Sequence, residues 1–292
     1  MYIKFWGTRG SIAAPGLKTV KFGGNTSCIE VRVDDKIFIF DAGTGIRELG
    51  MSFLNEFRSN SLKAHIFISH THWDHIQGFP FFRPGYKSGN HFCVYGPHGT
   101  ESGLEEVLSG QMEPDYFPAP LEEMRSKLEF INLQDPVKIG KTRVEFMYVN
   151  HPGLCLGYKI IAPHYTIVYT GDNERYSKVN FPNRHDKKSM DYLRDLDSHL
   201  IDFCKGADLA ICDSQYTEDE YSQHRGWGHS TILDVADLAT RAKVKRMALF
   251  HHDPMHDDNF LIKMETECRN CLDKMGFNGI CFGAREGFEL TL

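Results

Sequence analysis

The chain has 292 residues, of which 41% are hydrophobic and 25% charged, and these proportions are typical of ordinary globular proteins. The formal net charge of -6 argues against a broad nucleic-acid-binding surface, because such surfaces are usually basic. The first residues show no basic stretch before a long apolar segment, and no apolar run could span a bilayer. The eight scattered cysteines suit free thiols in a reducing compartment, so we expect a cytoplasmic protein with no membrane partner.

Short apolar runs with β-type composition alternate with segments of helical periodicity along the chain. The expected strands cover residues 2–6, 27–33, 36–40, 64–69, 91–95, 143–149, 158–161, 166–169, 209–212 and 246–250. The expected helices cover residues 100–109, 189–204, 231–242 and 260–275. Strands in both halves with helices between them predict an α/β protein whose sheets are covered by helices.

No repeat, low-complexity tract or Gly/Ser linker divides the chain, so we expect one domain over residues 1–292. Two stretches look like insertions, near 111–128 and 176–204. The first carries three prolines at its broken start, and the second carries Pro182 before its helical part. Functional loops and plain surface excursions both look like this.

The most informative motif is the run His70-Thr71-His72-Trp73-Asp74-His75, which directly follows an expected strand. Imidazole and carboxylate suit zinc and similar divalent ions. His70 and His72 lie two residues apart, so an extended backbone places both on one side of the strand end. Asp74 and His75 then turn toward a neighbouring point, and the motif predicts two metal ions that share this loop.

Further ligands are expected at the ends of later strands. His151 follows the strand over 143–149, and Asp172 follows the strand over 166–169. A carboxylate such as Asp172 can bridge two cations and offset part of their charge, which a neutral imidazole cannot do. His251 and the adjacent His252 follow the strand over 246–250.

The ordered motifs resemble those of the metallo-β-lactamase superfamily over nearly the whole chain. Within it, the chain is similar to the phosphodiesterase branch, which includes ribonuclease Z, phosphoribosyl cyclic phosphodiesterases and cyclic-nucleotide phosphodiesterases. Besides the histidine motif, the segments that carry this resemblance are 5–11, 40–45, 156–158, 169–172, 207–213, 228–231 and 244–251.

The resemblance implies a four-layer αββα sandwich with a dinuclear metal site. It also implies two sets of ligands. One metal takes His70, His72, His151 and Asp172, and the other takes Asp74, His75, Asp172 and a late histidine. An ungapped match favours His251 as that last ligand, with His252 as the alternative.

His229 has two interpretations. The segment 228–231 is a helix start, in which Ser230 or Thr231 caps the helix and Asp234 completes a capping box with Thr231. Capping does not need His229, and the resemblance implies that this histidine faces the substrate phosphate as a proton donor.

The expected chemistry is phosphodiester hydrolysis by a metal-bound hydroxide, with His229 protonating the leaving oxygen. Asp74 ligates a metal and orients the nucleophile. Asp41, Asp213 and His252 are candidates for residues that orient the ligands, although the two aspartates are equally well explained as turn and cap residues. Two divalent ions are expected, with zinc as the first candidate and manganese or iron as alternatives.

The substrate is expected to be a small phosphodiester, with a 3',5'-cyclic nucleotide as the first candidate. The ribonuclease Z pattern includes a long arm for transfer RNA between the His151 and Asp172 motifs, and only residues 152–171 join them here. We therefore expect no long nucleic acid as a partner. The alternatives are a phosphoribosyl cyclic phosphodiesterase, a nuclease on short RNA or DNA, and a lactone or thioester hydrolase. The sequence does not determine the oligomeric state, and both a homodimer and a monomer are compatible with it.

Overall fold

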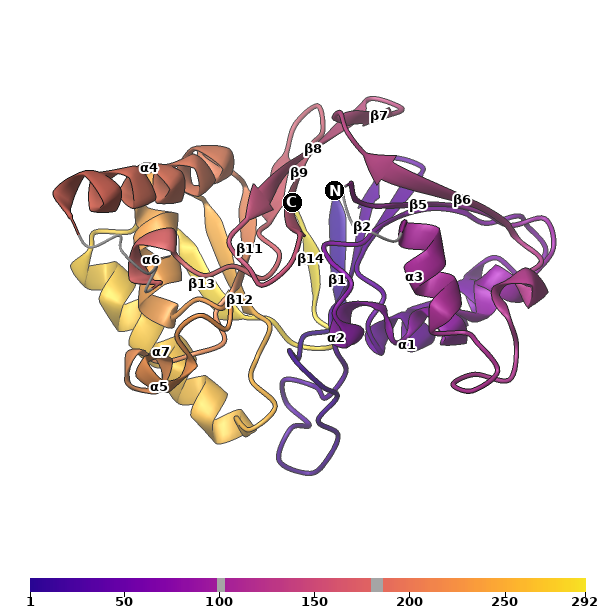
Figure 1. Ribbon diagram of the computed structural model, residues 1–292, viewed down its shortest axis with the longest axis horizontal. Helices are drawn as coiled ribbons and strands as arrows, with labels where there is room; N and C mark the ends of the chain where they lie inside the picture. Colours follow the sequence, from indigo (N-terminus) through magenta and orange to yellow (C-terminus); the bar gives the residue numbers. More distant parts are fainter. Residues whose placement is uncertain (99–102, 180–185) are drawn as a thin grey trace. The chain divides into compact units, whose positions relative to one another are not determined.

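The computed structural model describes residues 1–98, 103–179 and 186–292, and it divides into two compact units. The first unit consists of Met1–Gly140 and Arg285–Leu292, and the second of Lys141–Ala284. The described strands form two seven-stranded sheets, with the orders β14-β1-β2-β3-β4-β5-β6 and β13-β12-β11-β10-β9-β8-β7 (Figure 1). The expectation of one domain stays a prediction.

The first sheet has four parallel strands at one side and antiparallel strands at the other. Its strands are β1 (Tyr2–Gly7), β2 (Cys28–Val33), β3 (Lys36–Phe40), β4 (Lys63–Phe67), β5 (His91–Pro97), β6 (Lys127–Leu133) and β14 (Glu289–Thr291). The helices are α1 (Gly45–Glu56), α2 (Trp73–Ile76) and α3 (Leu104–Gly110), with 3-10 turns at Phe79–Phe81, Arg83–Tyr86 and Leu121–Glu123.

The core of this unit lies between one sheet face and the helices α1 and α3. On α1, Ile46, Leu49 and Phe53 are buried at spacings of three and four residues, which places them on one helical face. They join a buried cluster that includes Ile66 of β4 and Phe92 of β5. Burial of this apolar surface holds the helices against the sheet.

The second sheet contains a hairpin followed by parallel strands. Its strands are β7 (Val137–Ile139), β8 (Thr142–Val149), β9 (Cys155–Ile161), β10 (Thr166–Tyr169), β11 (Leu209–Asp213), β12 (Arg246–Phe250) and β13 (Ile280–Gly283). The helices are α4 (Lys187–Cys204), α5 (Glu218–His224), α6 (Ile232–Ala242) and α7 (Asp258–Lys274), after a 3-10 turn at Tyr176–Lys178. Helix α6 contacts α4, α7 and β11 (Figure 1). Among the described helices, none has the length and apolarity that a membrane span needs.

All the expected strands are present, and the expected helices correspond to α3, α4, α6 and α7. Helices α1, α2 and α5 and the strands β6, β7, β13 and β14 were not predicted. The first expected insertion contains a 3-10 turn and the start of β6, and the second contains another 3-10 turn and α4. Residues 100–102 of the expected helix over 100–109, and residues 180–185 of the second insertion, lie outside the described residues.

Strand direction determines where the polar loops gather in each unit. Strands β3 and β4 run parallel, so the residues that follow Phe40 and Phe67 lie at the same edge of the first sheet. Strands β10, β11 and β12 also run parallel. Strand β8 joins this direction, because it is antiparallel to β9 and β9 is antiparallel to β10. The loops after four strands of the second sheet therefore share one edge.

The core cluster predicts a large effect of Phe92→Ala. The Phe92 ring is fully buried and packs edge-to-face on Phe82, with ring centroids 5.1 Å apart. Its removal should lower the free energy of unfolding by about 3–5 kcal/mol in guanidinium denaturation. The control is Phe81→Ala, because the Phe81 side chain is 51% exposed. Equal losses in the two variants would contradict this assignment of the core.

Candidate metal centre

In the first unit, Asp41 holds the loop that follows β4. The Ser69 backbone N–H donates to Asp41 Oδ1 at 2.7 Å, and the Ser69 hydroxyl donates to Oδ2 at 2.9 Å. His75 Nδ1 lies 2.8 Å from the same Oδ2, and both side chains are fully buried. Asp41 adopts a left-handed backbone with φ 61°, which is uncommon for a residue other than glycine. Asp41 therefore fixes the orientation of the His75 ring.

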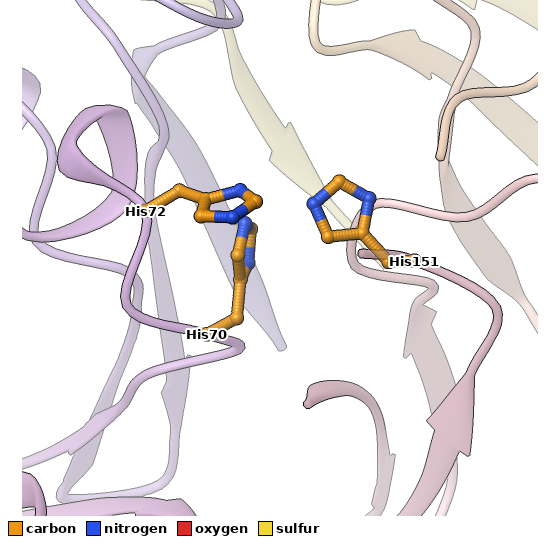
Figure 2. Close-up of side chains that lie close together, drawn as sticks. All are labelled: His70, His72 and His151. Carbon is orange, nitrogen blue, oxygen red and sulfur yellow. The ribbon is translucent and has the colours of Figure 1, made fainter. Parts of the chain in front are cut away.

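His70 and His72 extend from this loop, as Figure 2 shows. Their ring centroids are 4.5 Å apart at an interplanar angle of 78°. The Ser69 hydroxyl lies 3.1 Å from His70 Nδ1. His70 is 2% exposed, whereas His72 is exposed and occupies the N-cap position of α2. The ring nitrogen atoms of His70 and His72 are therefore close enough together to bind the same metal ion.

Asp74 lies in the first turn of α2, where negative charge is favourable. Its Oδ2 accepts a hydrogen bond from the Ser11 N–H at 2.7 Å and lies 3.3 Å from His75 Nε2. The side chain is almost fully buried. Burial of a carboxylate costs free energy unless donors compensate it, so the Ser11 amide stabilises Asp74 in its charged form.

In the second unit, His151 lies on the loop after β8 (Figure 2). Its Nδ1 lies 2.9 Å from the backbone carbonyl oxygen of Gly228. Gly228 has φ 89°, and a Cβ atom there would lie 2.2 Å from His151 Nδ1. Only glycine permits this close approach, so the Gly228 carbonyl fixes the His151 ring.

Asp172 and His251 face each other at the ends of β10 and β12. His251 Nε2 lies 3.2 Å from Asp172 Oδ2, and His251 Nδ1 lies 3.0 Å from Gln215 Oε1. His251 has φ 60°, a second left-handed residue at a strand end. His252 points elsewhere, because its Nε2 lies 2.9 Å from the backbone oxygen of Ala284. Within this unit the geometry therefore favours His251 over His252 as a metal ligand.

His229 lies beside this pair. Its ring stacks on His251 with centroids 4.9 Å apart, and its Nδ1 lies 3.0 Å from Asp213 Oδ2. Asp172, Asp213, His229 and His251 offer ligand atoms that all lie within 4.8 Å of one another. Thr231 caps α6 in a capping box with Asp234, so the predicted helix start is confirmed and Thr231, rather than Ser230, is the cap. The capping box does not involve the His229 ring.

Glu174 organises the loop that contains Gly226 and Gly228, and no sequence motif predicted this role. The buried carboxylate accepts hydrogen bonds from the backbone N–H groups of Gly226 and Gly228 and from the Tyr221 hydroxyl. Burial is the main cause that raises the pKa of Tyr221, and the hydrogen bond to Glu174 raises it further. The phenol therefore keeps the proton that it donates to Glu174. Glu174 thus positions Gly228, whose carbonyl positions His151.

The donor chemistry of these residues fits divalent metals. An imidazole whose Nδ1 faces an acceptor carries its proton there and presents the lone pair on Nε2. This arrangement recurs in the pairs His75–Asp41, His151–Gly228 and His251–Gln215. Carboxylates that bind metals must be ionised, and Asp74 and Asp172 supply such oxygens.

Comparison with known proteins identifies the family. Residues 37–252 match the Beta-lactamase superfamily domain. The chain belongs to this superfamily. It is 26% identical to ribonuclease Z of Picrophilus torridus over 91% of this chain and 90% of that protein. Superfamily membership and this similarity identify the chain as a metal-dependent hydrolase of the phosphodiesterase type. The superfamily also implies a dinuclear divalent-metal site built from His and Asp residues.

Solved structures show the fold. The metallo-β-lactamase fold protein YhfI of Bacillus subtilis is similar with a TM-score of 0.66 and 18% identity, covering 99% of each chain. The short form of human tRNase Z has a TM-score of 0.64 and 17% identity, covering 100% of this chain and 99% of that one. The predicted α/β sandwich is confirmed.

The expectation of a small phosphodiester and no long nucleic acid is wrong. The similar protein of Picrophilus torridus is named ribonuclease Z, and this name refers to RNA cleavage. The net charge sums over the whole chain, so it does not exclude a local surface that binds RNA. The segment 152–171 is too short to contain the long arm described above, but the candidate catalytic residues are all present. The comparisons likewise do not support the cyclic nucleotide, and they favour the nuclease alternative.

The contact between Gly228 and His151 predicts that Gly228→Ala displaces the His151 ring. Phosphodiesterase activity should fall by about 10²-fold, the cost of a misplacement near 1 Å. Gly226→Ala is the matched control, because Gly226 also has a positive φ but a Cβ there meets nothing within 4 Å. Kinetics on bis(p-nitrophenyl) phosphate would measure both. Equal activities in the two variants would contradict the role of Gly228.

Proposed function

We propose that this protein is a metal-dependent ribonuclease that hydrolyses a phosphodiester bond in RNA. The observation that carries the proposal is the similarity to ribonuclease Z across about nine-tenths of both chains. It is supported by the local geometry, in which buried imidazoles are oriented by acceptors at Nδ1. The eight free thiols suit a reducing compartment, which supports a cytoplasmic location.

We propose seven ligands for the two metal ions. They are His70, His72, Asp74, His75, His151, Asp172 and His251. Zinc suits this mixture of imidazole and carboxylate ligands, and manganese and iron accept the same ligand types. When bound, two such ions neutralise negative charge on the phosphate and lower the pKa of a water molecule.

The side chains around the ligands have separate tasks in this proposal. Asp74, held by the Ser11 amide, orients the attacking nucleophile. His229 donates a proton to the leaving oxygen from Nε2, while its Nδ1 stays bound to Asp213. The Asp213 carboxylate stabilises the ring when both nitrogens carry protons, and it prevents the ring from rotating. Asp213 is itself held by the backbone N–H groups of Asn173 and Gln215.

The contrast between His251 and His252 predicts different metal contents. His251→Ala should reduce bound metal below about two ions per chain, because a ligand is lost. His252→Ala should retain the wild-type content, because His252 faces a backbone carbonyl. Elemental analysis of the purified variants, with circular dichroism to verify folding, measures the difference. Loss of metal in the His252 variant alone would reverse the assignment.

The function is tested by cleavage of a transfer-RNA transcript and of an unstructured RNA oligonucleotide by the metal-loaded protein. His229→Ala should slow RNA cleavage by about 10²–10⁴-fold, the usual contribution of a positioned general acid. It should slow bis(p-nitrophenyl) phosphate hydrolysis far less, because p-nitrophenolate leaves without a proton.

Comparison of RNA with bis(p-nitrophenyl) phosphate also shows which part of the proposal fails, the role of His229 or the activity on RNA. Equal losses on RNA and on bis(p-nitrophenyl) phosphate would contradict His229 as the proton donor. Hydrolysis of bis(p-nitrophenyl) phosphate without cleavage of either RNA would contradict the ribonuclease and leave only a phosphodiesterase. Phe81→Ala, which alters an exposed ring outside the candidate centre, serves as the control for general effects of mutation.

A further inference from the structure

A second group of metal-ligating side chains lies on the first sheet. It consists of His91 and Cys93 of β5 and Glu129 of β6, and we call it the edge cluster because β6 is the edge strand of this sheet. The three side chains are half-buried. None of them belongs to the seven proposed ligands of the dinuclear centre.

Strand pairing brings the edge cluster together. His91 and Cys93 are two residues apart on β5, so their side chains point to the same face of the sheet. Strands β5 and β6 run parallel, and their register places Cys93 opposite Glu129. The positions are therefore fixed by backbone hydrogen bonds rather than by a flexible loop, which reduces the entropy lost when a ligand binds.

The distances within the edge cluster match a zinc site. Cys93 Sγ lies 3.7 Å from His91 Nε2 and 3.6 Å from Glu129 Oε2, and His91 Nε2 lies 3.4 Å from Glu129 Oε1. Ligands about 2.0–2.3 Å from a tetrahedral zinc ion are separated by roughly 3.4–3.6 Å. All three ligand atoms lie within 4.8 Å of one another. A thiolate, an imidazole and a carboxylate are the three zinc ligand types of proteins.

The neighbouring charges permit a cation at this place. Burial lowers the pKa of His65, which is opposite Cys93 on β4, to about 4, so His65 is neutral at pH 7. Lys127 forms an ion pair with Glu129, but its side chain is 65% exposed. Exposed ion pairs contribute little, so a divalent ion can displace the Lys127 ammonium group.

We propose that the edge cluster binds one zinc ion through Cys93, His91 and Glu129, with a water molecule as the fourth ligand. This site is separate from the dinuclear centre and does not depend on the ribonuclease activity. The ion joins the edge strand β6 to β5. Because it binds only the folded sheet, zinc at this site should raise the melting temperature of the protein, and the rise should grow with the logarithm of the zinc concentration divided by Kd.

Cobalt(II) is the probe for this site, because a thiolate bound to cobalt gives an intense charge-transfer absorption in the near ultraviolet. The proposed ligands of the dinuclear centre are nitrogen and oxygen atoms, so cobalt there gives no such absorption. The wild-type protein loaded with cobalt should show the band. Cys93→Ser should abolish it, and Glu129→Gln should weaken cobalt binding at this site by more than about tenfold.

Cys271→Ser is the matched control, because Cys271 is the other partly exposed thiol of the described chain. This variant should keep the band. Cys93→Ser should also keep the hydrolysis of bis(p-nitrophenyl) phosphate, which verifies that the protein remains folded. Absence of the band in the wild type, its survival in Cys93→Ser, or its loss in Cys271→Ser would overturn the proposal.

Discussion

The hydrogen bonds at Nδ1 of the buried imidazoles constrain the candidate centre more than any other interaction. Each ring is held by an acceptor that follows a strand or lies in a neighbouring loop, and this contact fixes its orientation. In the proposed ligands His75, His151 and His251 the proton then stays on Nδ1, and Nε2 keeps its lone pair. The acceptors are Asp41 for His75, the Gly228 carbonyl for His151, Asp213 for His229 and Gln215 for His251. Loss of one acceptor would free a ring to rotate, and a rotated ring no longer presents Nε2 to a metal.

Burial of the two acceptor carboxylates costs solvation free energy, and hydrogen bonds from backbone N–H groups offset this cost. A buried carboxylate is unfavourable unless donors surround it. Asp41 accepts from the Ser69 amide, and Asp213 accepts from the amides of Asn173 and Gln215. The backbone around the centre is thus shaped to stabilise negative charge. The left-handed conformations of Asp41 and His251 show that this shape is kept at the expense of local backbone energy.

Local spacing explains why the histidine motif could be predicted. His70, His72, Asp74 and His75 lie within six residues, so no knowledge of distant contacts was needed to place them together. Ten of the described strands and the helices α3, α4, α6 and α7 were also predictable from apolar periodicity. Helix α1 was missed because Gly45 and Gly50 weaken its helical signal, although both glycines are buried in the structure.

The sequence by itself determined the superfamily motifs, the ligand types and the strand ends that carry them, because these depend on neighbours along the chain. Only the tertiary structure decided that His251 rather than His252 faces Asp172, and that Glu174 holds the Gly228 loop. The edge cluster likewise depends on the register of β5 against β6. Register and loop contacts are set by packing between distant segments, and no local pattern in the sequence records them.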